Sequence, residues 1–257
     1  MNVLVIDVGG TNVKLLASGA SEPRKFNSGD GLTPAELVAG VLQTAAGWSY
    51  DVASLGIPSP VLRGAVMQEP WNLGHGWVGF DFAAALGVPV RIINDAAMQA
   101  LGSYDGGRML FLGLGSGLGT TLIDDGRIVA LELAHLPYRD STFEDVCGQR
   151  GLNQLGEDGW RAAVFDAAEQ LRAAVAAEYV MLGGGNVRLV GDLPPGFRRG
   201  SNDHAFEGGF RLWADAPHVP AAWSPVLAHC TTAAGVFGSL PFSISCWVST
   251  DSRDMPM

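Results

Sequence analysis

The chain has 257 residues, enough for one large domain or two lobes of ordinary size. Hydrophobic residues make up 47% and charged residues 16%, so the chain can bury a core, and a disordered polyampholyte is excluded. The formal net charge of −10 argues against a general nucleic-acid binder, since a phosphate backbone attracts basic surfaces. Cys147, Cys230 and Cys246 lack the spacing of a disulfide framework and fit a reducing, cytoplasmic setting.

The first part of the chain alternates between strand and helix patterns. The apolar run Val3–Ile6 predicts a buried strand that ends in the turn Asp7–Gly10, with Val13–Leu16 returning antiparallel. Thr33 opens a capping box, and its helix is expected to run to about Ala46. Further strands are expected at 52–57 and 88–93, and further helices at 82–86 and 96–101.

The pattern restarts after the glycine-rich segment 102–107. A strand is expected at Met109–Leu112, then a glycine turn at 113–119 and a return strand at Thr120–Ile123. A helix at 157–177 and a strand at 179–182 follow. Since strand, glycine turn and strand occur twice, we predict two lobes of similar plan, at 1–105 and 106–213.

Residues 214–257 are expected to be an appended tail. From Ala216 to Thr250 there is no Asp, Glu, Lys or Arg, but serine, threonine, Pro241 and His229 argue against a membrane span. The N-terminal apolar run reads as a strand and not as a signal peptide, because it runs straight into Asp7 and two glycines. We therefore expect no membrane association.

The glycine turns raise the question of phosphate binding. Backbone N–H groups in a tight turn can donate to phosphate oxygens, and a Cβ would block the approach. There is no G-x-x-x-x-G-K-[ST] motif, and Leu118 breaks the dinucleotide fingerprint. The alternative is that each turn is only a tight hairpin. Asp7, just ahead of the first turn, is a candidate for holding Mg²⁺ through water, or else a turn-forming residue.

Six segments, in chain order, resemble the ROK sugar kinases, and most closely the compact glucokinases and polyphosphate-glucokinase-like proteins. They are Asp7-Val8-Gly9-Gly10-Thr11-Asn12, Gly56-Ile57-Pro58-Ser59-Pro60, Ile93-Asn94-Asp95-Ala96, Leu112–Gly119, Glu132-Leu133-Ala134-His135 and Leu182-Gly183-Gly184-Gly185-Asn186. The resemblance implies an α/β fold of the actin-like ATPase-domain (hexokinase, ribonuclease H-like) type, with a cleft between two lobes. It also implies phosphoryl transfer from ATP, or from polyphosphate, to the 6-hydroxyl of glucose or a related hexose, with Mg²⁺.

The resemblance assigns roles to individual residues. Asp95 would be the catalytic carboxylate that accepts the proton of the sugar hydroxyl, although it could instead be the N-cap of the following helix. Asn94, Asp95, Glu132 and His135 would bind the sugar. The residues expected to bind the donor phosphates are Gly9, Gly10, Thr11, Gly115, Ser116, Gly117, Gly183, Gly184 and Gly185.

The sequence also departs from the ROK pattern. Members of the family commonly carry a zinc motif with several cysteines, but the corresponding stretch here has only Cys147, so we predict no zinc site. Ser59 stands where the family usually has glycine. A sugar-binding regulator without catalytic activity is the alternative function. The resemblance also allows a homodimer.

Overall fold

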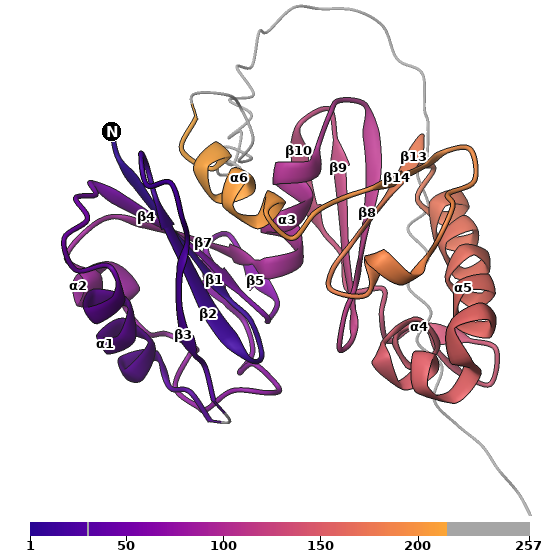
Figure 1. Cartoon of the computed structure of the whole chain (residues 1–257), viewed down its shortest axis with the longest axis horizontal. Helices are drawn as coiled ribbons and strands as arrows, with labels where there is room; N and C mark the ends of the chain where they lie inside the picture. Colours follow the sequence, from indigo (N-terminus) through magenta and orange to yellow (C-terminus); the bar gives the residue numbers. More distant parts are fainter. Residues whose placement is uncertain (30, 215–257) are drawn as a thin grey trace, which may run out of the picture. The chain divides into compact units, whose positions relative to one another are not determined.

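The computed structural model describes residues 1–29 and 31–214, and within them the chain forms two five-stranded sheets of the same plan (Figure 1). The strand orders are β3-β2-β1-β4-β7 and β10-β9-β8-β13-β14. In each sheet, three consecutive antiparallel strands are extended by two parallel strands. The predicted α/β fold class and the repeated hairpin are therefore confirmed.

The strands have the following bounds. The first sheet contains β1 (Val3–Val8), β2 (Asn12–Ala17), β3 (Arg24–Asn27), β4 (Val52–Ile57) and β7 (Val90–Asn94). The second contains β8 (Arg108–Leu114), β9 (Leu118–Asp124), β10 (Arg127–Ala130), β13 (Tyr179–Gly183) and β14 (Phe197–Arg199). Two small hairpins are formed by β5 (Val61–Leu62) with β6 (Ala65–Val66), and by β11 (Pro137–Tyr138) with β12 (Ser141–Thr142).

Two helices, α1 (Pro34–Thr44) and α2 (Phe82–Leu86), pack on the first sheet and share its core. The predicted capping box is confirmed: the Thr33 hydroxyl accepts from Glu36 N at 3.3 Å, and the Glu36 carboxylate accepts from Thr33 N at 2.9 Å. Gly87 ends α2 in the left-handed region, with φ +71°, which glycine adopts without steric cost.

The second sheet is covered by α4 (Phe143–Cys147) and α5 (Gln149–Ala174), which share a core with β8, β9 and β13. We expected a single helix at 157–177, but helical backbone begins at Gln149. Gly156 has φ 68° and ψ 174°, so α5 is two helices joined at a break. The expected start at 157 coincides with the start of the second of these helices.

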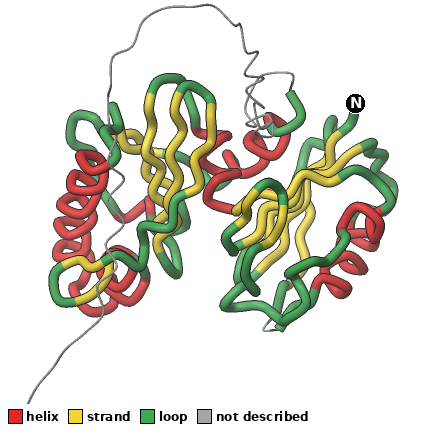
Figure 2. Tube along the Cα trace, turned by 180° about the vertical axis from the view of Figure 1, so that it is seen from behind, coloured by secondary structure: helices red, strands yellow, loops and turns green. Residues whose placement is uncertain are grey.

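Helices α3 (Asp95–Ser103) and α6 (His204–Arg211) pack against each other (Figure 2). The α6 helix, which the sequence pattern did not predict, also contacts β1 and β4 of the first sheet. Gly102, expected in the glycine-rich boundary segment 102–107, lies inside α3. A Cβ there would be 1.8 Å from the carbonyl oxygen of His204, so this glycine permits close helix packing.

A short one-turn helix, η1 (Val187–Leu189), follows the triple glycine. Across residues 1–29 and 31–214, no helix has both the length and the apolar character needed to cross a membrane. Residues 215–257, which hold nearly all of the expected tail and the segment considered as a membrane span, lie outside the described residues.

Candidate active site

Two carboxylates lie at one edge of the first sheet. Strands β1, β4 and β7 are parallel neighbours, so their carboxyl ends meet at the same edge, where α/β sheets commonly bind ligands. Asp7 is the penultimate residue of β1, and Asp95 directly follows β7 as the first residue of α3. The fold thus brings together two residues that are 88 positions apart in the sequence.

Asn94, and not Asp95, is the N-cap of α3. Asn94 Oδ1 accepts from Ala97 N at 3.1 Å, and its Nδ2 donates to the Ser59 carbonyl at 3.2 Å. The Asp95 carboxylate accepts from the neighbouring Ala96 N, at 2.8 Å, and not from the N–H groups of the second and third helical residues that an N-cap binds. The helix therefore does not depend on Asp95 for its cap, and the capping interpretation of Asp95 is not supported.

Ser59, the unusual residue of the sugar-side loop, has a structural contact of its own. Its hydroxyl donates to the Gln68 carbonyl at 2.6 Å, and its backbone carbonyl accepts from Asn94. The serine therefore holds the loop against the segment at 68 while the loop holds Asn94. The replacement of glycine at this position is compatible with an ordered loop.

The environment of Asp95 favours its neutral form. Burial raises the pKa of Asp95 to about 7, and the negative charges of Asp7 and Glu132 act in the same direction, while the backbone N–H of Ala96 opposes them. The residue nevertheless keeps part of its surface exposed. A carboxylate whose pKa lies near neutrality is suited to accept a proton, since its charged and neutral forms are both accessible there.

Asp7 is paired with Lys14, its cross-strand partner on β2. The Lys14 ammonium lies 3.6 Å from Asp7 Oδ2, and the two side chains are 39% and 15% exposed. Burial raises the pKa of Asp7, and the positive charge of Lys14 opposes that shift. Mg²⁺ sites often use one or two carboxylates together with substrate phosphates. A single carboxylate beside a glycine turn fits this donor set.

The first glycine turn, Gly9 to Thr11, is closed by a backbone hydrogen bond and lies beside the loop at 72. Gly9 N donates to Asn12 O at 3.0 Å and closes the turn. A Cβ on Gly10 would lie 2.6 Å from Asn72 Nδ2, so the side chain of Asn72, in the loop at 72, lies close to this glycine. Trp71 in that loop is fully exposed, so it is not a core residue.

The other two glycine segments lie together. Asn186 joins them, because its backbone N–H donates to Leu114 O at 2.9 Å and its Nδ2 lies 3.4 Å from Gly115 O. Its Nδ2 also donates to Gln149 Oε1 at 3.1 Å, and Gln149 N donates to Ser116 O at 3.2 Å. These contacts place residues 115–117 next to residues 183–186.

Within these segments, five glycines differ in what a Cβ at each position would meet. A Cβ on Gly117 would lie 2.3 Å from Glu144 Oε2, and one on Gly183 would lie 2.6 Å from the Phe111 ring. Gly184 has φ +81°, and its Cβ would meet Leu114 O at 2.4 Å. Gly115 and Gly185 meet nothing within 4 Å and have no positive φ. Neither packing nor backbone strain requires glycine at 115 or 185, so these two leave open space where a phosphate could approach.

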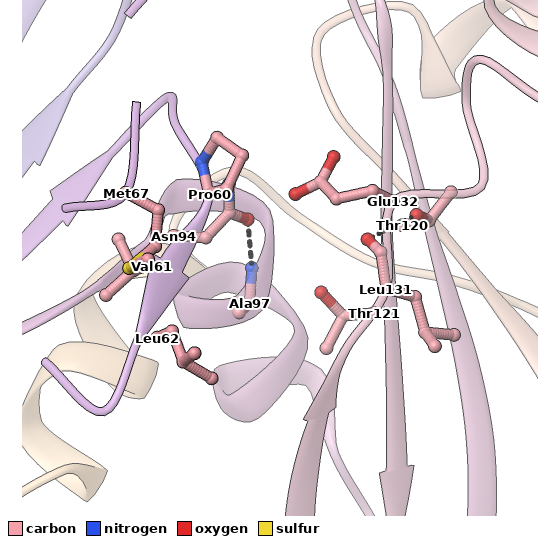
Figure 3. Close-up of a pocket in the computed structure, with 10 residues that line it drawn as sticks. All are labelled: Pro60, Val61, Leu62, Met67, Asn94, Ala97, Thr120, Thr121, Leu131 and Glu132. Atoms are coloured by element: carbon pink, nitrogen blue, oxygen red, sulfur yellow. Dashed lines mark hydrogen bonds between the residues drawn. The ribbon is translucent and has the colours of Figure 1, made fainter. Parts of the chain in front are cut away.

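A cavity of about 150 Å³ takes its lining from both sheets (Figure 3). Asn94 from the first sheet and Glu132, which follows β10, both line it. Burial raises the pKa of Glu132, His135 lowers it, and Glu144 raises it. The structure therefore brings together Asn94 and Glu132, two of the expected sugar-binding residues.

His135 is placed differently. It is exposed and is not among the residues that line the cavity, although its charge acts on Glu132. The segment around it is anchored, because Ala134 is buried and its carbonyl accepts from Glu144 N at 2.9 Å. The expected contact between His135 and a sugar stays a prediction.

Four residues near the site carry contacts that motif matching does not assign a role. Glu144 packs on Gly117 and accepts from Leu118 N at 3.3 Å, and Gln149 and Asn186 bridge the glycine segments. Thr121 lines the cavity. Of these, only Asn186 lies inside a recognised motif. The others depend on tertiary contacts that no local pattern reveals.

Cys147, at the position of the family's zinc motif, is a core residue. It is 2% exposed, and burial raises the pKa of its thiol to about 12. Its carbonyl accepts from Trp160 Nε1 at 2.8 Å. Among the described residues, no group of three or more His, Cys, Asp or Glu is arranged to hold a metal ion. The absence of zinc stays a prediction.

No family model matches the chain. The bifunctional enzyme NanE/NanK of Brucella melitensis biotype 1 is 25% identical over 240 residues, covering 71% of this chain and 45% of that enzyme. The chain thus spans less than half the length of this curated relative.

Solved structures resemble the chain over most of its length. The inorganic polyphosphate/ATP-glucomannokinase from Arthrobacter sp. strain KM has a TM-score of 0.68 and 22% identity, covering 80% of this chain and 96% of its own. The ROK family glucokinase from Streptomyces griseus, solved with glucose and AMPPNP, has a TM-score of 0.64 and 17% identity, covering 82% and 99%. The resemblance inferred from the motifs is therefore confirmed: the chain has the actin-like ATPase fold of the ROK-family sugar kinases.

Proposed function

We propose that the chain is a sugar kinase that transfers a phosphoryl group from ATP to the 6-hydroxyl of glucose or a related hexose. The observation that carries this proposal is the position of Asp95. It is a carboxylate that is not needed as a helix cap, has a pKa raised to about 7, and follows the cavity residue Asn94. The fold shared with solved ROK kinases supports the same activity.

In the proposed reaction, Asn94 and Glu132 hold the sugar in the cavity. Asp95 accepts the proton of the 6-hydroxyl while that oxygen forms a bond to the γ-phosphorus, and the bond from the γ-phosphorus to the bridging oxygen of the donor breaks. A sugar hydroxyl is a weak nucleophile, so removal of its proton by a positioned carboxylate assists the step. Positioning of the two substrates supplies much of the remaining acceleration.

The donor phosphates would lie against the open backbone at Gly115 and Gly185. The contacts of Asn186 and Gln149 hold these segments in place before any ligand arrives, so little backbone ordering would be needed on binding. Asp7 is the residue proposed to hold Mg²⁺. When bound, Mg²⁺ would neutralise charge on the donor phosphates.

ATP is the donor that the arginine contacts favour. Polyphosphate is a long polyanion and would need a track of free basic groups. Arg139 and Arg150 form ion pairs with Asp166 and Asp145. Arg198 lies over the Tyr179 ring and 3.6 Å from Asp105, and Arg199 donates to backbone carbonyls. All four arginines are thus engaged by other groups of the chain.

The direct test is a coupled assay of the purified protein with Mg²⁺. The sugars are glucose, mannose and N-acetylmannosamine, each offered with ATP and with polyphosphate. We expect hexose 6-phosphate formation that is faster with ATP. If the protein binds a hexose but forms no sugar phosphate with either donor, it is a sugar-binding regulator and the kinase proposal is wrong.

A further inference from the structure

Thr121, in the middle of β9, carries a hydroxyl that the fold does not use. The residue is 1% exposed, and its Oγ1 has no hydrogen-bond partner in the part of the chain that the structure describes. A buried hydroxyl without a partner costs free energy, because it has lost its bonds to water. Such a group in a native structure calls for an explanation.

The neighbouring Thr120 shows that the local fold can satisfy such a group. Thr120 Oγ1 donates to Leu131 O at 2.8 Å and accepts from Leu133 N at 3.1 Å. These bonds hold the segment that carries Glu132 against β9. The hydroxyl of Thr120 therefore has a structural role, whereas the hydroxyl of Thr121 has no hydrogen-bond partner among the described residues.

The Thr121 side chain faces into the cavity. In Figure 3 it extends from β9 toward Ala97, with Glu132 above it on the same side and Asn94 across the cavity. Most of the remaining lining is apolar, from Pro60, Val61, Leu62, Met67, Ala97 and Leu131. The unpartnered hydroxyl thus belongs to a residue in the wall of a cavity that has few polar groups.

Among the other polar side chains of the lining, Asn94 keeps one free donor, because only one of its two Nδ2 hydrogens is used, on the Ser59 carbonyl, while its Oδ1 accepts from Ala97 N. The hydroxyl of Thr120 is already engaged. Glu132, when ionised, only accepts hydrogen bonds. A hydroxyl side chain both donates and accepts, which matches the hydroxyl of a sugar.

We propose that the Thr121 hydroxyl is a specificity-determining group that hydrogen-bonds one non-reacting hydroxyl of the hexose. This inference rests on the proposed sugar-kinase function and adds to it a residue that reads the substrate. Binding of the correct sugar satisfies a buried group, whereas a sugar that lacks that hydroxyl leaves it unpaired. The cavity therefore discriminates between sugars by the free energy that is lost when the Thr121 hydroxyl stays unpaired.

The test compares two variants of Thr121 with wild type. Thr121→Val keeps the shape and removes the hydroxyl, whereas Thr121→Ser keeps the hydroxyl. Binding is measured by titration calorimetry without donor, using glucose, mannose and the 1-, 2-, 3- and 4-deoxy analogues of whichever binds wild type more tightly. The KM and kcat for the parent sugar are measured in parallel.

We expect Thr121→Val to weaken binding of the parent sugar by about 5- to 100-fold, the cost of one unmet hydrogen bond. One deoxy analogue should bind the valine variant and wild type equally, which would identify the hydroxyl that Thr121 contacts. Thr121→Ser should bind the parent sugar within about threefold of wild type, because the hydroxyl is retained. The valine variant should raise KM more than it lowers kcat, as loss of uniform binding does.

Thermal unfolding without sugar separates this role from a structural one. Thr121→Val should unfold no lower than wild type, because it removes an unpaired buried hydroxyl, while the control Thr120→Val should unfold lower, because it breaks two bonds. Thr121→Val with a lowered Tm and unchanged affinity for every sugar would overturn the inference. The kinase proposal would stand in that case if wild type still phosphorylates the hexose, and it would fail separately if wild type does not.

Discussion

Asp7 and Asp95 lie at the carboxyl ends of parallel strands of one sheet, close enough for the charge of Asp7 to add to burial in raising the pKa of Asp95 to about 7. Lys14 is salt-bridged to Asp7 on the neighbouring strand. The site thus holds the carboxyl groups of Asp7 and Asp95 near each other, with the ammonium group of Lys14 beside Asp7. An arrangement in which one carboxyl has a pKa near neutrality is typical of proton-transfer sites.

This pKa predicts the pH dependence of the reaction. Asp95 can accept a proton only when it is ionised, so kcat/KM should rise with pH through an apparent pKa of about 7 and then level off. Initial rates between pH 5.5 and 9 at low sugar concentration measure this profile. A profile that is flat across that range would show that the ionisation of Asp95 does not limit the reaction.

Removal of the carboxylate should abolish most of the activity while the site is kept in shape. Asp95→Asn retains the size of the side chain, and loss of a general base typically lowers the rate by about 10²- to 10⁴-fold. Sugar affinity should change far less than the rate. Asn94→Ala is the comparison, because it removes the N-cap and should lower Tm by weakening α3. A wild-type rate in Asp95→Asn would remove Asp95 from the catalytic role.

Asp95→Asn, which should lower activity, should at the same time raise the stability of the folded protein above neutral pH. Asp95 has a raised pKa in the folded chain, so between its ordinary pKa of 3.8 and about 7 the folded state binds more protons than the unfolded state. Stability of wild type therefore falls as pH rises through this window. Asp95→Asn lacks this loss, so its Tm should exceed that of wild type at pH 8 and differ less at pH 5. Equal Tm differences at both pH values would contradict the raised pKa.

Two adjacent glycines test where the donor binds. Gly185 has open space around it, whereas Gly184 has φ +81° and touches Leu114. Gly185→Ala should therefore leave Tm nearly unchanged and raise the KM for ATP by about tenfold or more, because the Cβ enters the open space where we propose that the donor phosphate binds. Gly184→Ala should lower Tm, since the backbone there is strained for any side chain. An unchanged KM for ATP in Gly185→Ala would place the donor elsewhere.

Local signals in the sequence predicted the ends of several elements. Thr33 with Glu36 marked the start of α1, Gly87 marked the end of α2, and the apolar run 52–57 coincides with β4. Each of these depends on residues within one or two turns of chain. The doubled strand, glycine turn and strand pattern predicted the two sheets for the same reason.

Tertiary contacts explain what the sequence pattern missed. The α6 helix has a short apolar face and is stabilised by packing on α3 and β1, which lie far away in the sequence. The role of Thr121 depends on a cavity lined from both sheets. Motif matching assigned the glycines at 115–117 and 183–185 to phosphate binding as a group. The contacts show that Gly115 and Gly185 have open space around them, whereas a Cβ at Gly117, Gly183 or Gly184 would meet a neighbouring atom.

Gly102 provides the final prediction, because the sequence placed it in the boundary segment 102–107 whereas the structure places it inside α3. A Cβ at this position would lie 1.8 Å from the His204 carbonyl and 2.7 Å from Gly208 N, both on the backbone at α6. Gly102→Ala should therefore push α6 away from α3 and lower the free energy of unfolding by about 1 to 3 kcal/mol, the usual cost of overpacking.

Gly159→Ala is the control, since it is also inside a helix and its Cβ would meet only Leu155 Cβ, at 3.3 Å. Alanine is a better helix former than glycine, so this control should be neutral or stabilising by up to about 1 kcal/mol. Urea denaturation of both variants measures the difference. Equal stabilities would show that α3 and α6 are not packed as closely as the structure has them.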